Sequence, residues 1–213
     1  MKARYQAIRD EIARNCDLVS RDSSSVTLIA VSKTQPAENV RKLYDLGQRH
    51  FGESRLQELL PKAEELPKDI VWHFIGKLQS NKLRKAAEVC SVLHTIESES
   101  QVKEICKLSK PIEILIEVNI AEEEQKSGIL IKSLDSLHTS VIQSDLAIFR
   151  GLMTIGPIVR EAEDSRPYFE KLRSLNNKIG GEWLSMGMSA DFGVAVQEGA
   201  THIRVGTSLF GER

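Results

Sequence analysis

A lysine stands directly after an apolar run, where a charged side chain calls for an explanation. Residues 26–32 read VTLIAVS, Lys33 follows, and Pro36 ends the regular pattern. Most lysines are exposed, so a solvated side chain is the ordinary interpretation. A lysine held among strands is partly desolvated, which lowers its pKa and provides the neutral amine that attacks an aldehyde. Lys33 is therefore a candidate for covalent binding of a carbonyl compound.

Two segments near the end of the chain carry groups that bind an anion. Gly187, Met188 and Ser189 follow one apolar segment, and Gly206 and Thr207 follow the next. Glycine lets the backbone approach a ligand closely, hydroxyls donate hydrogen bonds, and amides near a helix start favour negative charge. Taken singly, each segment is ordinarily a turn or a helix cap. Their occurrence on two consecutive predicted strands indicates a phosphate cradle.

A reactive lysine and a phosphate cradle together indicate a phosphorylated carbonyl compound. Pyridoxal 5′-phosphate fits both groups, although a sugar-phosphate aldolase would use the same two parts. Arg204, in the segment THIRVGT, helps to choose between these alternatives if it points inward and faces the cofactor. Its guanidinium can only donate a hydrogen bond to a pyridine nitrogen. A pyridine nitrogen that faces it stays unprotonated, and the ring is then a weaker electron sink than one paired with aspartate. A position at the rim is the alternative for this arginine.

Three histidines form a competing constellation. His50, His73 and His94 lie near three consecutive apolar segments, and inward imidazoles on such strands can bind a metal. We expect His50 to precede its strand and the other two to lie in mid-strand, away from the end where open ligand positions are found. These positions disfavour a metal site.

The elements that must position these residues alternate along the chain. Apolar strand-like segments occur at 26–32, 49–53, 71–76, 92–96, 113–120, 147–155, 182–188 and 201–207. Helical patterns occur at 3–19, 36–46, 53–66, 79–89, 98–108, 132–143, 162–179 and 191–198. Strict alternation predicts parallel strands joined by right-handed crossovers.

Eight strands of this kind predict an α/β fold of one particular architecture. They can close into a single (β/α)8 barrel, whereas a doubly wound open sheet usually has fewer strands. We therefore predict one barrel domain over residues 1–213, with an extra helix at its N-terminus. Barrels bind ligands at the carboxyl ends of their strands, and phosphate often binds after strands seven and eight. Lys33 and both glycine segments would lie at that end.

Composition limits the partners and the location of the protein. The 29 basic and 30 acidic residues give a net charge of −1, so no global field attracts nucleic acid or an acidic membrane surface. No apolar run approaches the roughly 20 residues that span a bilayer, and the first residues lack a signal peptide's apolar core, so we expect a cytoplasmic protein. Cys16, Cys90 and Cys106 form no C-x-x-C pair, and we expect all three to be buried or half-buried.

Eight segments in order make the chain resemble the pyridoxal phosphate homeostasis proteins along nearly its whole length. They are AVSKTQP from Ala30, FGESRLQE from Phe51, WHFIGKLQSNK from Trp72, HTI from His94, VNIAEEEQKSG from Val118, GLMTI from Gly151, LSMGMSADF from Leu184 and IRVGTSLFGER from Ile203. Any one of them is weak evidence, but eight in the same order are specific.

The resemblance implies a barrel like the N-terminal domain of alanine racemase and assigns roles to residues. In the family, the lysine that matches Lys33 forms an aldimine with pyridoxal 5′-phosphate. The residues that match Ser189, Gly206 and Thr207 hold the phosphate, and the arginine that matches Arg204 faces the pyridine nitrogen. Pyridoxal 5′-phosphate is thus the expected cofactor, and no metal is expected.

Two further residues complete the expected cofactor site. Met188 belongs to the same segment as Ser189. Ser54 stands where the family usually has asparagine in FGEN. Because a hydroxyl is shorter than an amide and has one donor instead of two, we expect this contact to be weaker and the affinity for the cofactor modestly lower.

Two functions of different classes follow, a cofactor carrier and a racemase or decarboxylase. The related racemases use a second base, a tyrosine from a partner subunit's additional β domain, and the chain ends at Arg213 with no residues for that domain. Tyr5, Tyr44 and Tyr168 all fall on predicted helices. We therefore expect a monomer without catalytic residues that holds pyridoxal 5′-phosphate and supplies it to apoenzymes, in keeping with the resemblance.

Overall fold

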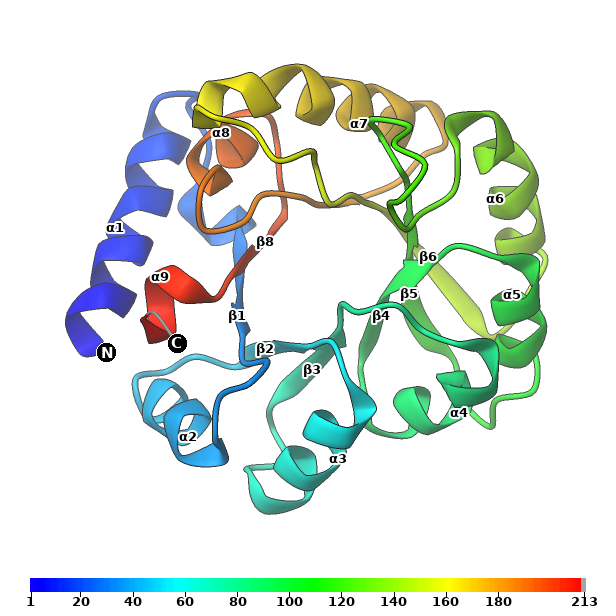
Figure 1. Cartoon of the computed structure of the whole chain (residues 1–213), viewed down its shortest axis with the longest axis horizontal. Helices are drawn as coiled ribbons and strands as arrows, with labels where there is room; N and C mark the ends of the chain where they lie inside the picture. Colours follow the sequence, from blue (N-terminus) through cyan, green and yellow to red (C-terminus); the bar gives the residue numbers. More distant parts are fainter. Residues whose placement is uncertain (212–213) are drawn as a thin grey trace.

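The chain folds into a closed barrel of parallel strands (Figure 1). The computed structural model describes residues 1–211, and the eight strands within them pair in sequence order, with the last pairing to the first. The strands are β1 Thr27–Val31, β2 His50–Glu53, β3 Val71–Phe74, β4 Val92–Ile96, β5 Ile112–Glu117, β6 Ala147–Met153, β7 Trp183–Ser185 and β8 His202–Val205. The predicted (β/α)8 fold is confirmed, and the last two residues of the matching segment from Ile203 lie outside the described residues.

Helices surround the barrel (Figure 1). They are α1 Lys2–Asp17, α2 Ala37–Asp45, α3 Leu56–Glu65, α4 Ser80–Val89, α5 Glu99–Ile105, α6 Leu134–Ile142, α7 Arg166–Lys178, α8 Phe192–Gln197 and α9 Thr207–Phe210. Short 3-10 turns occur at Ser23–Ser25, Ile131–Ser133 and Ala162–Ser165. Six of these strands end before the apolar segments that predict them, because the last residues of those segments belong to the loops at the carboxyl end. Among the helices of residues 1–211, none has the length and apolar character needed to cross a bilayer.

The extra N-terminal helix, α1, packs on the outside of the barrel beside the last two helices. α1 contacts both α8 and α9, and its buried side chains Ile8, Ile12 and Cys16 recur every four residues on one face. Arg21, just after the helix, donates from its two Nη atoms to the carbonyls of Val196 and Ala200 at 2.9 Å each. Burial of a large aliphatic side chain stabilises the fold by about 1.5–3 kcal/mol, so this face holds α1 on the barrel.

Strand alternation divides the side chains between two environments. On β4, for example, Leu93 packs in the main core, whereas Val92 belongs to a separate small apolar cluster. Because successive strand residues face opposite sides of a sheet, the main core lies under the helices and the small cluster inside the barrel. By the same alternation, His202 and Arg204 point inward, since Ile203 packs in the main core.

The prediction for the cysteines is partly wrong. Cys16 and Cys90 are buried, but Cys106 is exposed. Val102 and Ile105 occupy the buried face of α5, and Cys106 follows the last residue of that helix on its outer side.

Candidate cofactor site

Lys33 lies in the turn that joins β1 to α2, at the carboxyl end of the barrel. Its side chain is exposed, so the prediction that it is partly desolvated among the strands is wrong. The physical reason is that β1 ends at Val31 and the chain turns at residues 33–34, which lifts the lysine beyond the strand ends. Lys33 shares the lining of a pocket with Val31, Gln35, Gly206, Thr207, Phe210 and Gly211.

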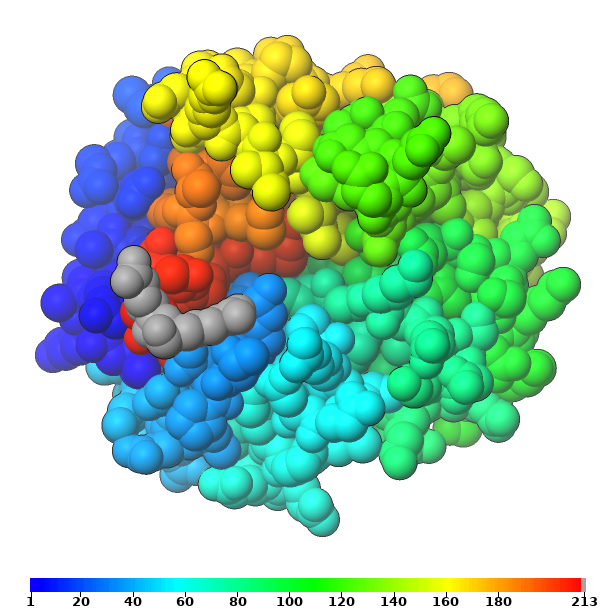
Figure 2. Space-filling model, in the orientation of Figure 1, coloured from blue at the N-terminus to red at the C-terminus, as the bar shows by residue number. Residues whose placement is uncertain are grey.

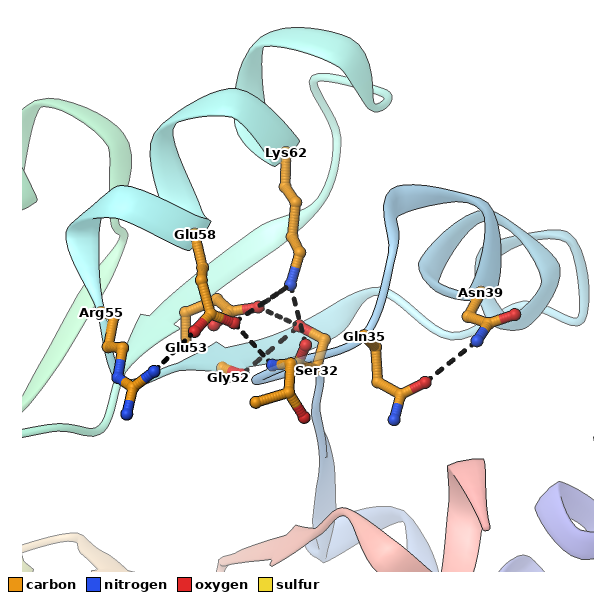
Figure 3. A network of polar contacts seen from close by, with 9 residues as sticks. Ser32, Gln35, Asn39, Gly52, Glu53, Arg55, Glu58 and Lys62 are labelled. Atoms are coloured by element: carbon orange, nitrogen blue, oxygen red, sulfur yellow. Dashed lines mark hydrogen bonds and ion pairs between the residues drawn. The ribbon is translucent and has the colours of Figure 1, made fainter. Parts of the chain in front are cut away.

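Charged side chains of β2 and α3 hold this turn from the outer side of the sheet (Figure 3). Lys62 Nζ donates to the Ser32 carbonyl at 2.8 Å and pairs with Glu53 Oε1 at 2.5 Å. The Ser32 hydroxyl donates to the same Oε1 at 2.8 Å. Thr34, at a left-handed φ of 65°, donates its amide hydrogen to Glu58 Oε2 at 2.5 Å. Such a backbone conformation persists only where the surroundings impose it, so these contacts fix the backbone on both sides of the lysine.

Sequence reasoning missed this arrangement. Glu58 and Lys62 lie four residues apart on α3 and therefore share a helix face. Glu53 ends β2 with a fully buried side chain. A buried carboxylate needs a charged or hydrogen-bonded partner. Lys62, nine residues after Glu53 on the next helix, is the residue that the sequence offers as this partner.

Ser189 and Gly206 meet where the chain leaves β7 and β8. The Gly206 amide donates to Ser189 Oγ at 3.4 Å, and Thr207 begins α9 directly afterwards. Lys33 lines one pocket with Gly206 and Thr207, and in the space-filling view of Figure 2 red atoms near the end of the chain lie next to blue atoms near its start. The structure therefore brings Lys33, Gly206 and Thr207 together, with Ser189 joined to them through one hydrogen bond.

The turn after β7 is held mainly by packing and by one aspartate. Gly187 has a φ of +87°, and a Cβ atom there would lie 2.5 Å from the Ala195 Cβ. Asp191 accepts the Met188 amide hydrogen on Oδ1 at 2.7 Å and the Ser165 hydroxyl on Oδ2 at 3.0 Å. The Met188 side chain is exposed. Gly187 is thus required by its conformation and by its contact with α8.

Arg204 points into the barrel and is buried, so the alternative of a rim position is wrong. Its Nη1 donates to Ser185 Oγ at 2.6 Å, and its Nη2 donates to the Thr154 carbonyl at 2.7 Å. Burial lowers the pKa of Arg204 to about 10, and the carboxylates of Glu117 and Asp191 oppose that shift. The guanidinium therefore stays charged at neutral pH and is held in one orientation.

The three histidines pair with one another inside the barrel. His50 Nδ1 lies 3.0 Å from His73 Nε2, and His73 Nδ1 lies 2.8 Å from His94 Nε2. His50 is the first residue of β2 rather than preceding it. Within residues 1–211, no group of three or more His, Cys, Asp or Glu side chains is arranged to hold a metal ion.

Ser54 lies apart from the Lys33 pocket. It is half-buried and lines a neighbouring pocket above β2 and β3, together with Arg55, Lys77 and Lys82. Its backbone carbonyl packs against Gly76, where a Cβ atom would lie only 2.2 Å from that oxygen. Neither Ser54 nor the exposed Met188 lines the Lys33 pocket, and their contact with the cofactor stays a prediction.

Glu117 is a buried carboxyl group inside the barrel that sequence analysis did not single out. Burial is the largest cause that raises the pKa of Glu117, to about 7, and the negative charge of Glu97 adds to it. The positive charges of Arg204 and Lys77 oppose the shift. The carboxyl group therefore keeps its proton up to neutral pH.

Glu117→Gln is expected to flatten the pH dependence of stability. The folded-state pKa lies above the ordinary value of 4.5, so this carboxyl stabilises the fold fully below pH 4.5, and the contribution is lost as the pH rises through about 7. The difference between the two pKa values, 4.5 and about 7, corresponds to about 3 kcal/mol in the free energy of unfolding. Urea unfolding of the cofactor-free protein at both ends of this range measures it, with exposed Glu124→Gln as control. Equal pH dependence in the wild type and Glu117→Gln would contradict the shift.

Comparison with known proteins gives matches over almost the whole chain. Residues 8–213 match the family model of the alanine racemase N-terminal domain. The pyridoxal phosphate homeostasis protein of Aquifex aeolicus strain VF5 is 39% identical, over 99% of this chain and 97% of its own length.

Solved structures are also similar to this chain. PipY of Synechococcus elongatus PCC7942, solved with PLP bound, is 37% identical with a TM-score of 0.77, over 94% of this chain and 100% of its own. Alanine racemase of Corynebacterium glutamicum has a TM-score of 0.68 at 19% identity, over 96% of this chain and 61% of its own, and shares the fold alone. The chain belongs to the alanine racemase N-terminal domain family and, within it, to the pyridoxal phosphate homeostasis proteins.

Proposed function

We propose that residues 1–213 form one domain that binds pyridoxal 5′-phosphate covalently through Lys33 and keeps it available to apoenzymes in the cytoplasm. One observation carries this proposal: Lys33 lines the same pocket as Gly206 and Thr207. The pocket thus combines an amine with backbone amide and hydroxyl donors, which are the groups that an aldehyde and a phosphate require. The solved PipY structure with PLP bound supports the choice of ligand. We propose a monomer.

The residues present fit this cofactor. The amides of Thr207 and Ser208 lie in the first turn of α9, where backbone N–H groups have no acceptor within the helix. With the hydroxyls of Ser189 and Thr207, they form a donor set for phosphate oxygens. Arg204 can only donate, so it would leave a pyridine nitrogen that faces it unprotonated. We expect Ser54 and Met188 to contact the cofactor only at its edge.

Lys33 would supply the covalent step. Lys33 Nζ would hold the cofactor through a carbon–nitrogen double bond to its aldehyde carbon, and the aldehyde oxygen would leave as water with the two amine hydrogens. The exposure of Lys33 lets the reaction run in both directions, since water can reach the bond and release the cofactor. When bound, pyridoxal 5′-phosphate supplies an electrophilic conjugated ring. Reversible attachment suits a carrier.

The alternative, a racemase or decarboxylase, has one observation in its favour. Glu117 has a pKa of about 7, which suits an acid–base group at neutral pH. Against it, Lys33 is the acid–base side chain among the described residues that line its pocket, and no second one lines it. The tyrosines Tyr5, Tyr44 and Tyr168 lie on α1, α2 and α7, on the outside of the barrel. We therefore propose a carrier without enzymatic turnover.

Two measurements on one sample test the carrier role. Addition of pyridoxal 5′-phosphate should produce a new absorbance band from the lysine-bound cofactor. The loaded protein is then incubated with L-alanine in deuterated water, and Cα deuterium should appear no faster than with free cofactor. Fast exchange that Glu117→Gln abolishes would establish the racemase alternative instead.

Gly206→Ala is expected to weaken cofactor binding without unfolding the protein. A Cβ at this position would lie 3.4 Å from the Val31 Cβ and carbonyl oxygen, on the pocket wall. Gly206 has a negative φ of −119°, so the added methyl group does not meet the strain of a left-handed backbone, and stability should change little. We expect an increase of about tenfold or more in Kd, about 1.4 kcal/mol, in a spectroscopic titration. Gly156→Ala is the control, because a Cβ there would meet only Phe169 at 4.0 Å, and equal affinities for both variants would contradict the phosphate cradle.

A further inference from the structure

A row of hydrogen bonds crosses the barrel interior and ends at Arg204. It starts at His50, which lines a pocket formed by the first residues of several strands, among them Thr27, Val71 and Trp183. This pocket therefore lies at the N-terminal mouth of the barrel, opposite the Lys33 pocket. From His50 the row continues through the four side chains His73, His94, Ser185 and Arg204 at 3.0, 2.8, 2.9 and 2.6 Å.

Arg204 determines the direction of these hydrogen bonds. Its guanidinium only donates, so Ser185 Oγ accepts from Nη1. The Ser185 hydroxyl hydrogen then needs an acceptor of its own, and within the described residues His94 Nδ1, at 2.9 Å, is the contact that provides one. The opposite direction would leave this buried hydroxyl hydrogen unpaired, at a cost of about 1–3 kcal/mol.

The direction propagates through all three imidazoles. Because His94 accepts on Nδ1, it carries its hydrogen on Nε2 and donates to His73 Nδ1. His73 then carries its hydrogen on Nε2 and donates to His50 Nδ1. A neutral imidazole donates from one nitrogen and accepts on the other, whereas the cation only donates and would break the row.

The surroundings keep these rings neutral. Burial is the main reason that the pKa values of His73 and His94 lie well below the ordinary range, and mutual repulsion and the charge of Arg204 add to the effect for His94. Burial also lowers the pKa of His50. All three histidines can therefore act as donor and acceptor at once.

We propose that Ser185, His94 and His73 are positioning residues for Arg204. Ser185 Oγ accepts from Nη1 and the Thr154 carbonyl accepts from Nη2, which fixes the plane of the guanidinium. His94 and, through it, His73 fix the Ser185 hydroxyl in turn. The role toward the pyridine ring rests on the proposed function. The hydrogen-bond direction does not, and it makes a prediction for the cofactor-free protein: His50, His73 and His94 all carry their hydrogen on Nε2.

Nitrogen-15 NMR of the histidine side chains tests the direction without any variant. In the cofactor-free wild type, we expect protonated Nε2 and unprotonated Nδ1 for all three residues. Ser185→Ala should remove the constraint and convert His94 to a mixture of both forms, whereas Ser140→Ala, at a half-buried serine on α6 outside the row, should change nothing. Hydrogen on Nδ1 of His94 in the wild type, or no change in Ser185→Ala, would overturn the inference.

The loaded protein tests the positioning role. With the cofactor still bound to Lys33, Ser185→Ala should shift the wavelength or the pH midpoint of the absorbance band of the cofactor. Ser140→Ala should leave both unchanged. An unchanged band in a properly loaded Ser185→Ala protein contradicts the positioning role. Failure of the wild type to take up cofactor would instead contradict the proposed function, and the NMR result would still decide the hydrogen-bond direction.

Discussion

Lys33→Ala is expected to abolish covalent attachment of pyridoxal 5′-phosphate and to leave the fold intact. Lys33 is exposed in the turn after β1, so its side chain contributes little to stability, within about 0.5 kcal/mol. The absorbance band of the lysine-bound cofactor should be absent after addition of pyridoxal 5′-phosphate. The donors around Gly206 and Thr207 remain, so the variant should keep some non-covalent affinity.

Lys42→Ala is the matched control for this experiment. Lys42 is also exposed and lies on α2, close in sequence to the turn, but it pairs with Glu38 on the helix surface at 2.7 Å. The control should show the wild-type band and wild-type affinity. A Lys33→Ala protein that still develops the band would show that another amine holds the cofactor.

Lys62→Met is expected to cause the largest loss of stability, about 3–5 kcal/mol. Lys62 is the ion partner of Glu53, whose side chain is fully buried and whose Oε2 already has no hydrogen-bond partner. Even with Lys62 present, burial raises the pKa of Glu53. Removal of Lys62 leaves this carboxylate uncompensated and also removes the donor to the Ser32 carbonyl.

Urea unfolding measures this effect against Lys42→Met. The Lys42–Glu38 pair has a comparable distance of 2.7 Å but lies in solvent, where an i,i+4 pair contributes about 0.3–0.5 kcal/mol. Glu53→Gln combined with Lys62→Met should recover a large part of the loss, because the double variant leaves no unpaired charge at this buried position. Equal losses in Lys62→Met and Lys42→Met would contradict the buried-pair account.

The barrel and part of the site follow from local patterns in the sequence. Alternation of strand-like and helical segments is sufficient to predict the barrel, and barrel geometry alone places Lys33, Ser189 and Gly206 at one end. The inward position of Arg204 follows from the alternation of side chains along β8, once Ile203 is assigned to the outer face.

The remaining features depend on tertiary arrangement. The exposure of Lys33 results from the turn at residues 33–34, and the apolar run before it carries no information about that turn. The row of histidines depends on strand register: His50 pairs with Val71, and His73 pairs with Val92. This stagger brings residues at different positions in their strands to neighbouring levels inside the barrel.

Identification of the lysine that binds the cofactor tests the central claim most directly. The protein is incubated with pyridoxal 5′-phosphate, reduced with borohydride, digested, and analysed by mass spectrometry. We predict the mass of the reduced cofactor on the peptide that contains Lys33 and on no other peptide. A label on Lys77 or Lys82, which line the neighbouring pocket with Ser54, or no label at all, would contradict the account.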